Sequence, residues 1–211
     1  MMINTREYRD MKIEIEKRET EDSEPTYKVR GYASTFEPYM LFEDEDGVKY
    51  YEKILPTAFD DADMTDVVLR IDHEGKVYAR TSAGDLALGT DEHGLWQEAD
   101  LSKTASGRSL FEDIAAGHYP KMSFAFIVDE DSYDGKSHTR TISRIGKVFD
   151  VSPVSWPANP GTELNVATRS YFDGVIKKER AERLAEEARK MKLEILTLVL
   201  NKILEPKEDG N

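Results

Sequence analysis

Apolar residues follow two different periods along this chain of 211 residues, and the change of period limits the folds that it can adopt. As far as about residue 155, short segments alternate polar and apolar side chains, which is typical of β-strands with one solvated face. From Ser170 onward, apolar residues recur at spacings of four and three, which predicts a long amphipathic helix. We therefore expect a β-rich part followed by a helical part.

Several local signals predict individual elements of the β-rich part. Residues 12–19 (KIEIEKRE) and 26–35 (TYKVRGYAST) are expected to pair as antiparallel strands, and residues 85–101 are expected to form a hairpin with its turn at 91–94. ILPTAFDDAD, which follows Lys53, predicts a short helix with Thr57 as its N-cap.

A second helix is predicted in the middle of the chain, where TASGRSLFEDIAAGHYP begins at Thr104. Thr104 is the expected N-cap, Gly117 stands where a C-terminal cap belongs, and Pro120 prevents the helix from continuing. Many short antiparallel strands with one such helix indicate an α+β protein that is mainly β, a barrel or a sandwich with helices outside it. The predicted divisions are a β-rich domain at 1–169, a helical extension at 170–204 and a disordered tail at 205–211.

Composition excludes several classes of function. The chain carries 29 basic against 42 acidic residues, and the whole excess of acid lies in residues 1–170, which argues against binding nucleic acid. It has no cysteine, so disulfides, thiolate metal sites and a cysteine nucleophile are absent. The longest apolar stretch, LEILTLVLNKIL, is too short and too interrupted to span a membrane, and the N-terminus shows no apolar signal core.

Three polar residues stand at strand ends where chemistry is often placed. His73 closes a predicted strand on the same face as Val67, Leu69 and Ile71. Ser123 opens the alternating strand MSFAFIV, and Asp150 closes another strand before a proline-rich segment. Histidine, serine and aspartate together can perform nucleophilic catalysis, but each has a structural interpretation as well: a solvated strand end, a small residue beside the core and a carboxylate that binds backbone amides.

The sequences around these residues resemble those of the prohead proteases of tailed bacteriophages, whose fold is similar to that of the herpesvirus assemblin protease. The resemblance extends over about residues 12–168 and rests on six motifs in order: KVRGYASTFE, YYEKILPTAFDDAD, VVLRIDHEGK, SAGDLALGTDEHGLWQEADL, TASGRSLFEDIAAGHYPKMSFAF and DVSPVSWPANP. It implies an antiparallel assemblin-like β-barrel for the first domain.

The resemblance also implies roles for the three residues. Ser123 would be the nucleophile, His73 the proton acceptor and Asp150 the group that orients the imidazole. Relatives often carry glutamate at the third position, and the herpesvirus enzymes use a second histidine, so His93 and His118 are alternative third members. Many relatives also carry glycine where this chain has Ala125.

The donors of an oxyanion hole have no sequence signature here. Three arginines are candidates for supporting a loop that carries such donors: Arg108, Arg140 and Arg144.

The function implied is a serine endopeptidase that cleaves segments of the phage capsid protein or its scaffold, and itself, inside an assembling procapsid in the host cytoplasm. No cofactor, metal, nucleic acid or membrane is expected. The helical extension would bind scaffold or capsid protein, or another copy of the chain, or it would fold back on the first domain. Two other classes stay open. One is a catalytically silent scaffold protein, and the other is a metal-dependent hydrolase that uses His73 with Asp72, Glu74 and a further acidic residue.

Overall fold

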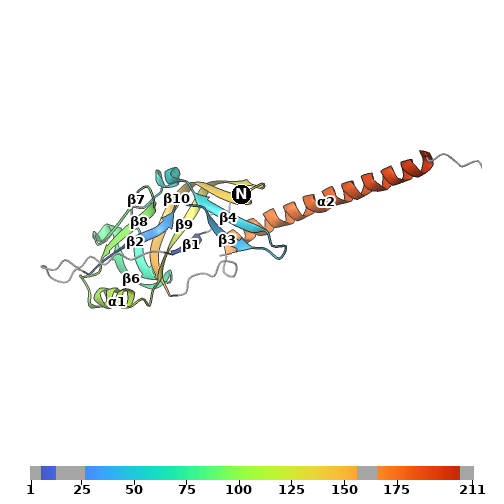
Figure 1. Cartoon of the computed structure of the whole chain (residues 1–211). Helices are drawn as coiled ribbons and strands as arrows, with labels where there is room; N and C mark the ends of the chain where they lie inside the picture. The colour runs from blue at the N-terminus through green and yellow to red at the C-terminus, as the bar shows by residue number, and fades with distance from the viewer. Residues whose placement is uncertain (1–5, 13–26, 156–165, 205–211) are drawn as a thin grey trace, which may run out of the picture. The chain divides into compact units, whose positions relative to one another are not determined.

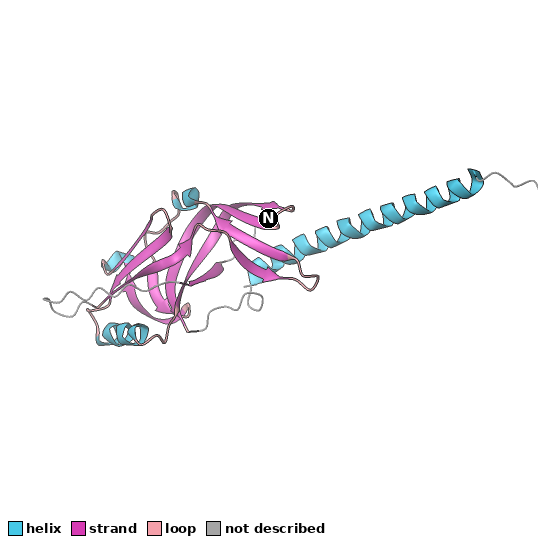
Figure 2. Ribbon diagram, in the orientation of Figure 1, coloured by secondary structure: helices cyan, strands magenta, loops and turns pink. Residues whose placement is uncertain are grey.

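The computed structural model describes residues 6–12, 27–155 and 166–204. The contacts divide the chain into two compact units, 1–167 and 168–211, and each unit is described by itself. The first unit holds all the strands of the described residues, and Figure 2 shows them in magenta with short helices between them.

Two hydrogen-bonded sheets make up the first unit (Figure 1). The larger sheet has the order β1-β9-β10-β4-β3, with β5 and β6 joined to it through β10; its strands are β1 (Glu7–Lys12), β3 (Tyr39–Glu43), β4 (Lys49–Ile54), β5 (Val68–Ile71), β6 (Glu74–Arg80), β9 (Lys121–Asp134) and β10 (Thr139–Val154). The smaller sheet has the order β2-β8-β7, with β2 (Lys28–Thr35), β7 (Leu86–Thr90) and β8 (Gly94–Asp100). The expected α+β, mainly β class is confirmed.

One hydrophobic core is shared by the two sheets and the mid-chain helix. Phe124 and Phe126 of β9 stack with ring centroids 4.3 Å apart, and Leu95 of β8 belongs to the same buried cluster. Among the described residues, hydrogen bonds leave the two sheets separate and do not close them into a barrel. The assemblin-like barrel therefore stays a prediction.

Several expected elements are confirmed and one needs correction. The 85–101 hairpin forms as β7 and β8. Thr57 is not an N-cap, because the short 3-10 helix Pro56–Phe59 begins after Leu55, with proline at its first position and no side-chain cap. The strand expected at 12–19 lies outside the described residues apart from Lys12, so its pairing with residues 26–35 stays a prediction. Lys12 ends β1, which pairs with β9.

The mid-chain helix α1 (Ala105–Ala115) begins as its sequence predicts. The Thr104 hydroxyl accepts a hydrogen bond from the Gly107 amide at 2.9 Å, which satisfies one of the free donors of the first turn. Gly117 follows the helix with a φ of 85°, a conformation that glycine adopts without steric cost. Leu110 and Ile114 then bury one face of α1 in the core.

The second unit contains a single helix, α2 (Val166–Leu204), of 39 residues. At 1.5 Å per residue it is about 58 Å long. Large apolar side chains of α2 are exposed from Leu184 onward: Leu184, Met191, Leu193, Ile195, Leu196, Leu198, Val199 and Leu200. No described helix is both long and apolar enough to cross a membrane.

A cluster of buried charges joins β1 to the rest of the larger sheet. The Arg9 guanidinium donates to Glu52 of β4 through Nε and Nη2, with Nη2 2.7 Å from Oε2, and Tyr39 donates to the same carboxylate. Arg140 of β10 binds Glu7 with Nη1 and Nη2 at 2.8 and 3.0 Å. Glu52 is fully buried, so these pairs neutralise charges that would otherwise be costly in the protein interior.

Glu7 makes the stability of the fold depend on acid. Burial raises the pKa of Glu7, but the guanidinium groups of Arg9 and Arg140 outweigh burial and lower that pKa from 4.5 to about 2. A carboxyl with a lowered folded-state pKa stabilises the protein above its unfolded pKa, and this stability is lost as pH falls. The shift corresponds to about 3 kcal/mol.

We therefore expect Glu7→Gln to lower the free energy of unfolding by about 3 kcal/mol at pH 7, and the difference from the parent protein to shrink between pH 4.5 and 2. Urea unfolding at a series of pH values measures it. Glu98→Gln is the control, since it removes an exposed pair with Lys28 and should cost less than about 1 kcal/mol. A difference from Glu7→Gln that does not vary with pH would contradict the role of this carboxyl.

Candidate active site

The register between β9 and β10 places Ser123 and Asp150 on one face of the larger sheet. Ser123 is paired with Ser152, and Ala125 is paired with Asp150. Directly opposed residues of an antiparallel pair point to the same side, so all four side chains share a face. Ser123 and Asp150 are diagonal neighbours in this pattern, and diagonal positions are about 7–8 Å apart, which leaves room for a ring between them.

A β-bulge at Phe149 aims Asp150 at that face. The pairing steps from Val148–Phe126 to Asp150–Ala125, so β10 has one more residue than β9 at this point. Val148 lies in the core, and without the bulge the alternation would turn Asp150 toward the core as well. With the bulge, Val151 takes the next core position and Asp150 faces His73.

His73 is carried by a tight turn between β5 and β6. We expected it to continue the inward face of its strand, but β5 ends at Ile71 and the pairing of Ile71 with Glu74 leaves a two-residue loop. Asp72 and His73 have φ values of 47° and 61°, the left-handed region that type I′ hairpin turns require at both central positions. Neither residue is glycine, so the surrounding structure must stabilise this conformation.

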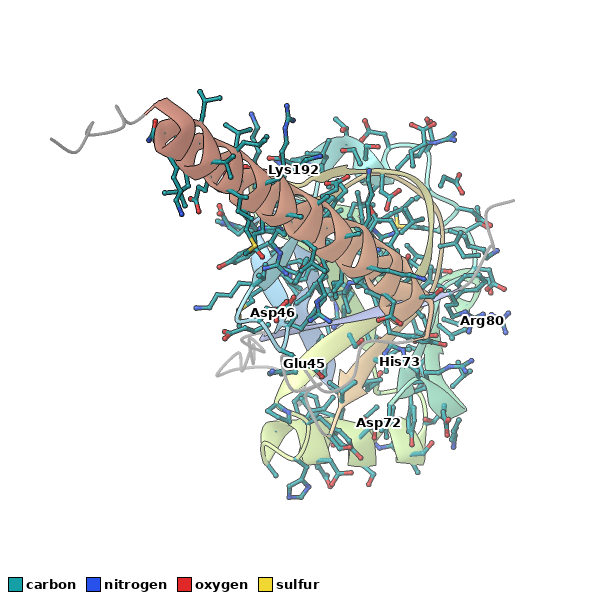
Figure 3. All side chains as sticks on the ribbon, turned by 90° about the vertical axis from the view of Figure 1, so that its right-hand side faces the viewer. Glu45, Asp46, Asp72, His73, Arg80 and Lys192 are labelled. Atoms are coloured by element: carbon teal, nitrogen blue, oxygen red, sulfur yellow. The ribbon has the colours of Figure 1, made fainter. Side chains whose placement is uncertain are left out.

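Hydrogen bonds to the end of β10 and to Ser155, which follows it, hold the turn. The Asp72 carboxylate accepts from the amide and the hydroxyl of Ser155, both at 2.8 Å, and the Asp72 amide donates to the Pro153 carbonyl at 3.1 Å. Arg70 donates to the His73 carbonyl at 3.3 Å. Figure 3 labels Asp72 and His73 in this turn. The carboxylate of Asp72 therefore stabilises the turn through its hydrogen bonds with Ser155.

The imidazole of His73 lies between the other two predicted residues. Its Nδ1 is 2.6 Å from Oδ1 of Asp150, and its Nε2 is 2.7 Å from Oγ of Ser123. The His73 side chain is 16% exposed, whereas Asp150 and Ser123 are 1% and 0% exposed. With the Nδ1 proton donated to the carboxylate, Nε2 is left as an acceptor for the serine proton, which is the arrangement that activates a hydroxyl.

Ser152 is a further member of the site that the sequence did not reveal. Its hydroxyl donates to Oδ1 of Asp150 at 2.9 Å and accepts from the His73 amide at 3.2 Å. It therefore links the orienting carboxylate to the backbone of the turn. The only sequence signal was its position two residues after Asp150 on the same strand, which becomes informative once the register is known.

The alternative third members lie elsewhere. His93 is exposed in the turn between β7 and β8, and His118 is exposed after α1, 3.4 Å from Asp113. Asp150, and neither of these histidines, lies within hydrogen-bond distance of Nδ1 of His73.

The three arginines considered for the oxyanion have other partners. Arg108 donates to the Ser102 carbonyl and Arg144 binds Glu130, while Arg140 belongs to the buried cluster.

The groups considered for a metal site do not gather around His73. Asp72 is bound to Ser155, and no group of three or more His, Asp or Glu side chains within the described ranges could hold a metal ion.

A hydrogen bond also connects the serine to the N-terminal strand. The Ser123 hydroxyl lies 2.9 Å from the carbonyl oxygen of Arg9, and the ring of Tyr8 packs edge-on against the His73 ring at 4.5 Å. A hydroxyl has a single proton, so it can donate to Arg9 or to His73 but not to both at once.

Comparison with known proteins gives one match. The family model of the caudovirus prohead serine protease matches residues 12–174, more than three quarters of the chain. No curated protein and no solved structure matches it. Because the matched region contains the turn, both strands and all three residues described above, the sequence and the geometry agree: the chain belongs to the caudovirus prohead serine protease family.

Proposed function

We propose that this protein is a serine endopeptidase that matures a phage procapsid by cleaving segments of the capsid protein or its scaffold, and itself. The observation that carries the proposal is the chain of contacts from Ser123 through His73 to Asp150, at 2.7 and 2.6 Å. Membership of the prohead protease family supports the choice of substrate class.

In the proposed mechanism, Ser123 Oγ attacks the scissile carbonyl while its proton passes to Nε2 of His73. Asp150 keeps the Nδ1 proton in place and stabilises the imidazolium that forms. The imidazolium then gives its proton to the leaving amine, and an acyl-enzyme remains on Ser123. Water, deprotonated by the same imidazole, releases the acid and restores the hydroxyl.

The wider setting belongs to the same proposal. The reaction needs no cofactor, and it would take place inside the assembling shell in the host cytoplasm. The two sheets around one core would correspond to the assemblin-like barrel of the family, with residues 1–169 as the protease domain and 170–204 as an extension.

We further propose that α2 associates with a second copy of itself as a parallel coiled coil. Leu184, Met191 and Leu198 repeat every seven residues, with Ala188 and Ile195 between them, and this 4–3 spacing makes a coiled-coil seam. In this heptad Glu187 and Lys192 occupy g and e positions, five residues apart, where a parallel partner places opposite charges together. The capsid or scaffold protein is the other candidate partner.

Ser123→Ala should abolish processing of a co-expressed capsid or scaffold protein, a loss of about 10⁴ to 10⁶ in rate, because it removes the hydroxyl that lies 2.7 Å from Nε2 of His73. Mass spectrometry of the partner detects the new termini. Ser143→Ala is the control, because it removes a serine hydroxyl of β10 that donates to the Glu130 carbonyl, and this variant should process normally. Normal processing by the Ser123 variant would refute the assignment.

Asp150→Asn should lower the rate by up to about 10⁴, since the amide favours the wrong tautomer of His73. Ser152→Ala should lower the rate only about tenfold, because it removes a positioning hydrogen bond of about 1 kcal/mol. Cleavage rates of the two purified variants, with circular dichroism to show that both fold, make the test. If Asp150→Asn cleaves at a near-normal rate, the third role belongs to another residue.

Met191→Glu together with Leu198→Glu should reduce self-association of the full chain, because each places a charge in the apolar seam. Static light scattering measures the mass. Thr197→Glu, which adds a charge to the same helix off the seam, is the control. An unchanged mass in the double variant would exclude the coiled coil. If the double variant keeps its mass but no longer binds the capsid protein in a pull-down, the apolar seam binds that partner instead.

A further inference from the structure

The N-terminal strand β1 occupies the free edge of β9, beside Ser123. Its pairing is antiparallel over its whole length, from Glu7 opposite Phe126 to Lys12 opposite Lys121, and Asp10 faces Ser123 in this register. On its other edge β9 pairs with β10, so β1 takes the one lateral position from which a peptide could add to β9 as a strand. Extended peptides commonly bind in this way, through main-chain hydrogen bonds to a sheet edge.

The contacts of β1 block both reacting groups. The Arg9 carbonyl oxygen accepts from the Ser123 hydroxyl at 2.9 Å, and the Tyr8 ring lies against His73. Ser123 is 0% exposed. A substrate carbonyl therefore cannot reach Oγ while β1 is in place. Oγ of Ser123 contacts a peptide carbonyl of β1, as it would in a bound substrate. In β1 the contact is made by the carbonyl oxygen, which accepts the hydroxyl proton.

The side chain of Arg9 anchors the strand on the opposite face. Its guanidinium makes a two-nitrogen pair with Glu52, a carboxylate that is completely buried. If β1 leaves, Glu52 loses the closest of its cationic partners, with Arg140 Nη1 remaining at 3.2 Å. A buried carboxylate in that position favours another guanidinium in the place of the first.

The family match supports treating β1 separately from the protease. The matched residues begin at 12, so β1 lies almost wholly before them, whereas Glu52, His73 and Ser123 all lie inside.

We infer that β1 is an internal occupant of the substrate-binding edge, and that a substrate binds there as an extended antiparallel strand with an arginine side chain on Glu52 and the carbonyl of that arginine at Ser123. This inference rests on the proposed protease function. It identifies Glu52 as a specificity-determining residue and predicts low activity in the resting protein. Activity rises when β1 is displaced.

The test measures how fast a fluorophosphonate probe labels Ser123 in full-length variants. Arg9→Gln weakens the anchor of β1 and should speed labelling at least tenfold. The double variant Arg9→Gln with Glu52→Gln should do the same without leaving a buried charge unpaired, which covers the case in which the single variant fails to fold. Lys28→Gln, at an exposed pair with Glu98, should label at the parent rate.

A synthetic peptide of residues 4–12, NTREYRDMK, tests the recognition of arginine. It should slow labelling of the Arg9→Gln protein, and the same peptide with glutamine in place of Arg9 should not. In the double variant, which lacks the Glu52 carboxylate, the two peptides should differ little. Equal effects of the two peptides on the Arg9→Gln protein would overturn the role of Glu52.

The remaining outcomes separate this inference from the proposed function. Labelling that depends on Ser123 but is no faster in the folded double variant would overturn the inference and leave the protease assignment intact. Labelling that persists in Ser123→Ala, or is absent from every variant, would overturn the protease assignment and this inference with it.

Discussion

The pairing of β9 with β10 is the interaction on which the rest of the site depends. It places Ser123 opposite Ser152 and, through the bulge at Phe149, turns Asp150 from the core to the same face. The gap between these diagonal positions fits the ring of His73, which a turn anchored to the end of β10 delivers. A change of register by one residue would move Ser123 into the core and separate the three groups.

Sequence patterns predicted the elements better than their arrangement. The caps of α1 and the 85–101 hairpin depend on neighbouring residues and were found from local signals. The three candidate site residues are predicted through motifs shared with a family, because single residues of these types have no specific signal. The positive φ values at Asp72 and His73, the bulge and the role of Ser152 arise from contacts between distant segments, which alternation alone does not encode.

The same buried charges stabilise the fold and hold β1 over Ser123. Glu7 and Arg9 anchor β1 to Glu52 and Arg140, so the strand that covers Ser123 is also held by buried ion pairs. In the account proposed above, the same carboxylate that stabilises the resting state recognises the substrate. A protease enclosed with its substrates would gain from this arrangement, since a high local substrate concentration inside a shell would favour the substrate over an internal competitor.

The proposed function depends above all on the activation of Ser123 by His73. The most direct measurement is to react the protein with a fluorophosphonate and to identify the modified residue by peptide mass spectrometry, in parallel with His73→Ala. The account predicts one adduct, on Ser123, that forms at least about 10³ times more slowly in the His73 variant. An adduct on a different residue, or equal labelling of Ser123 in both proteins, would contradict it.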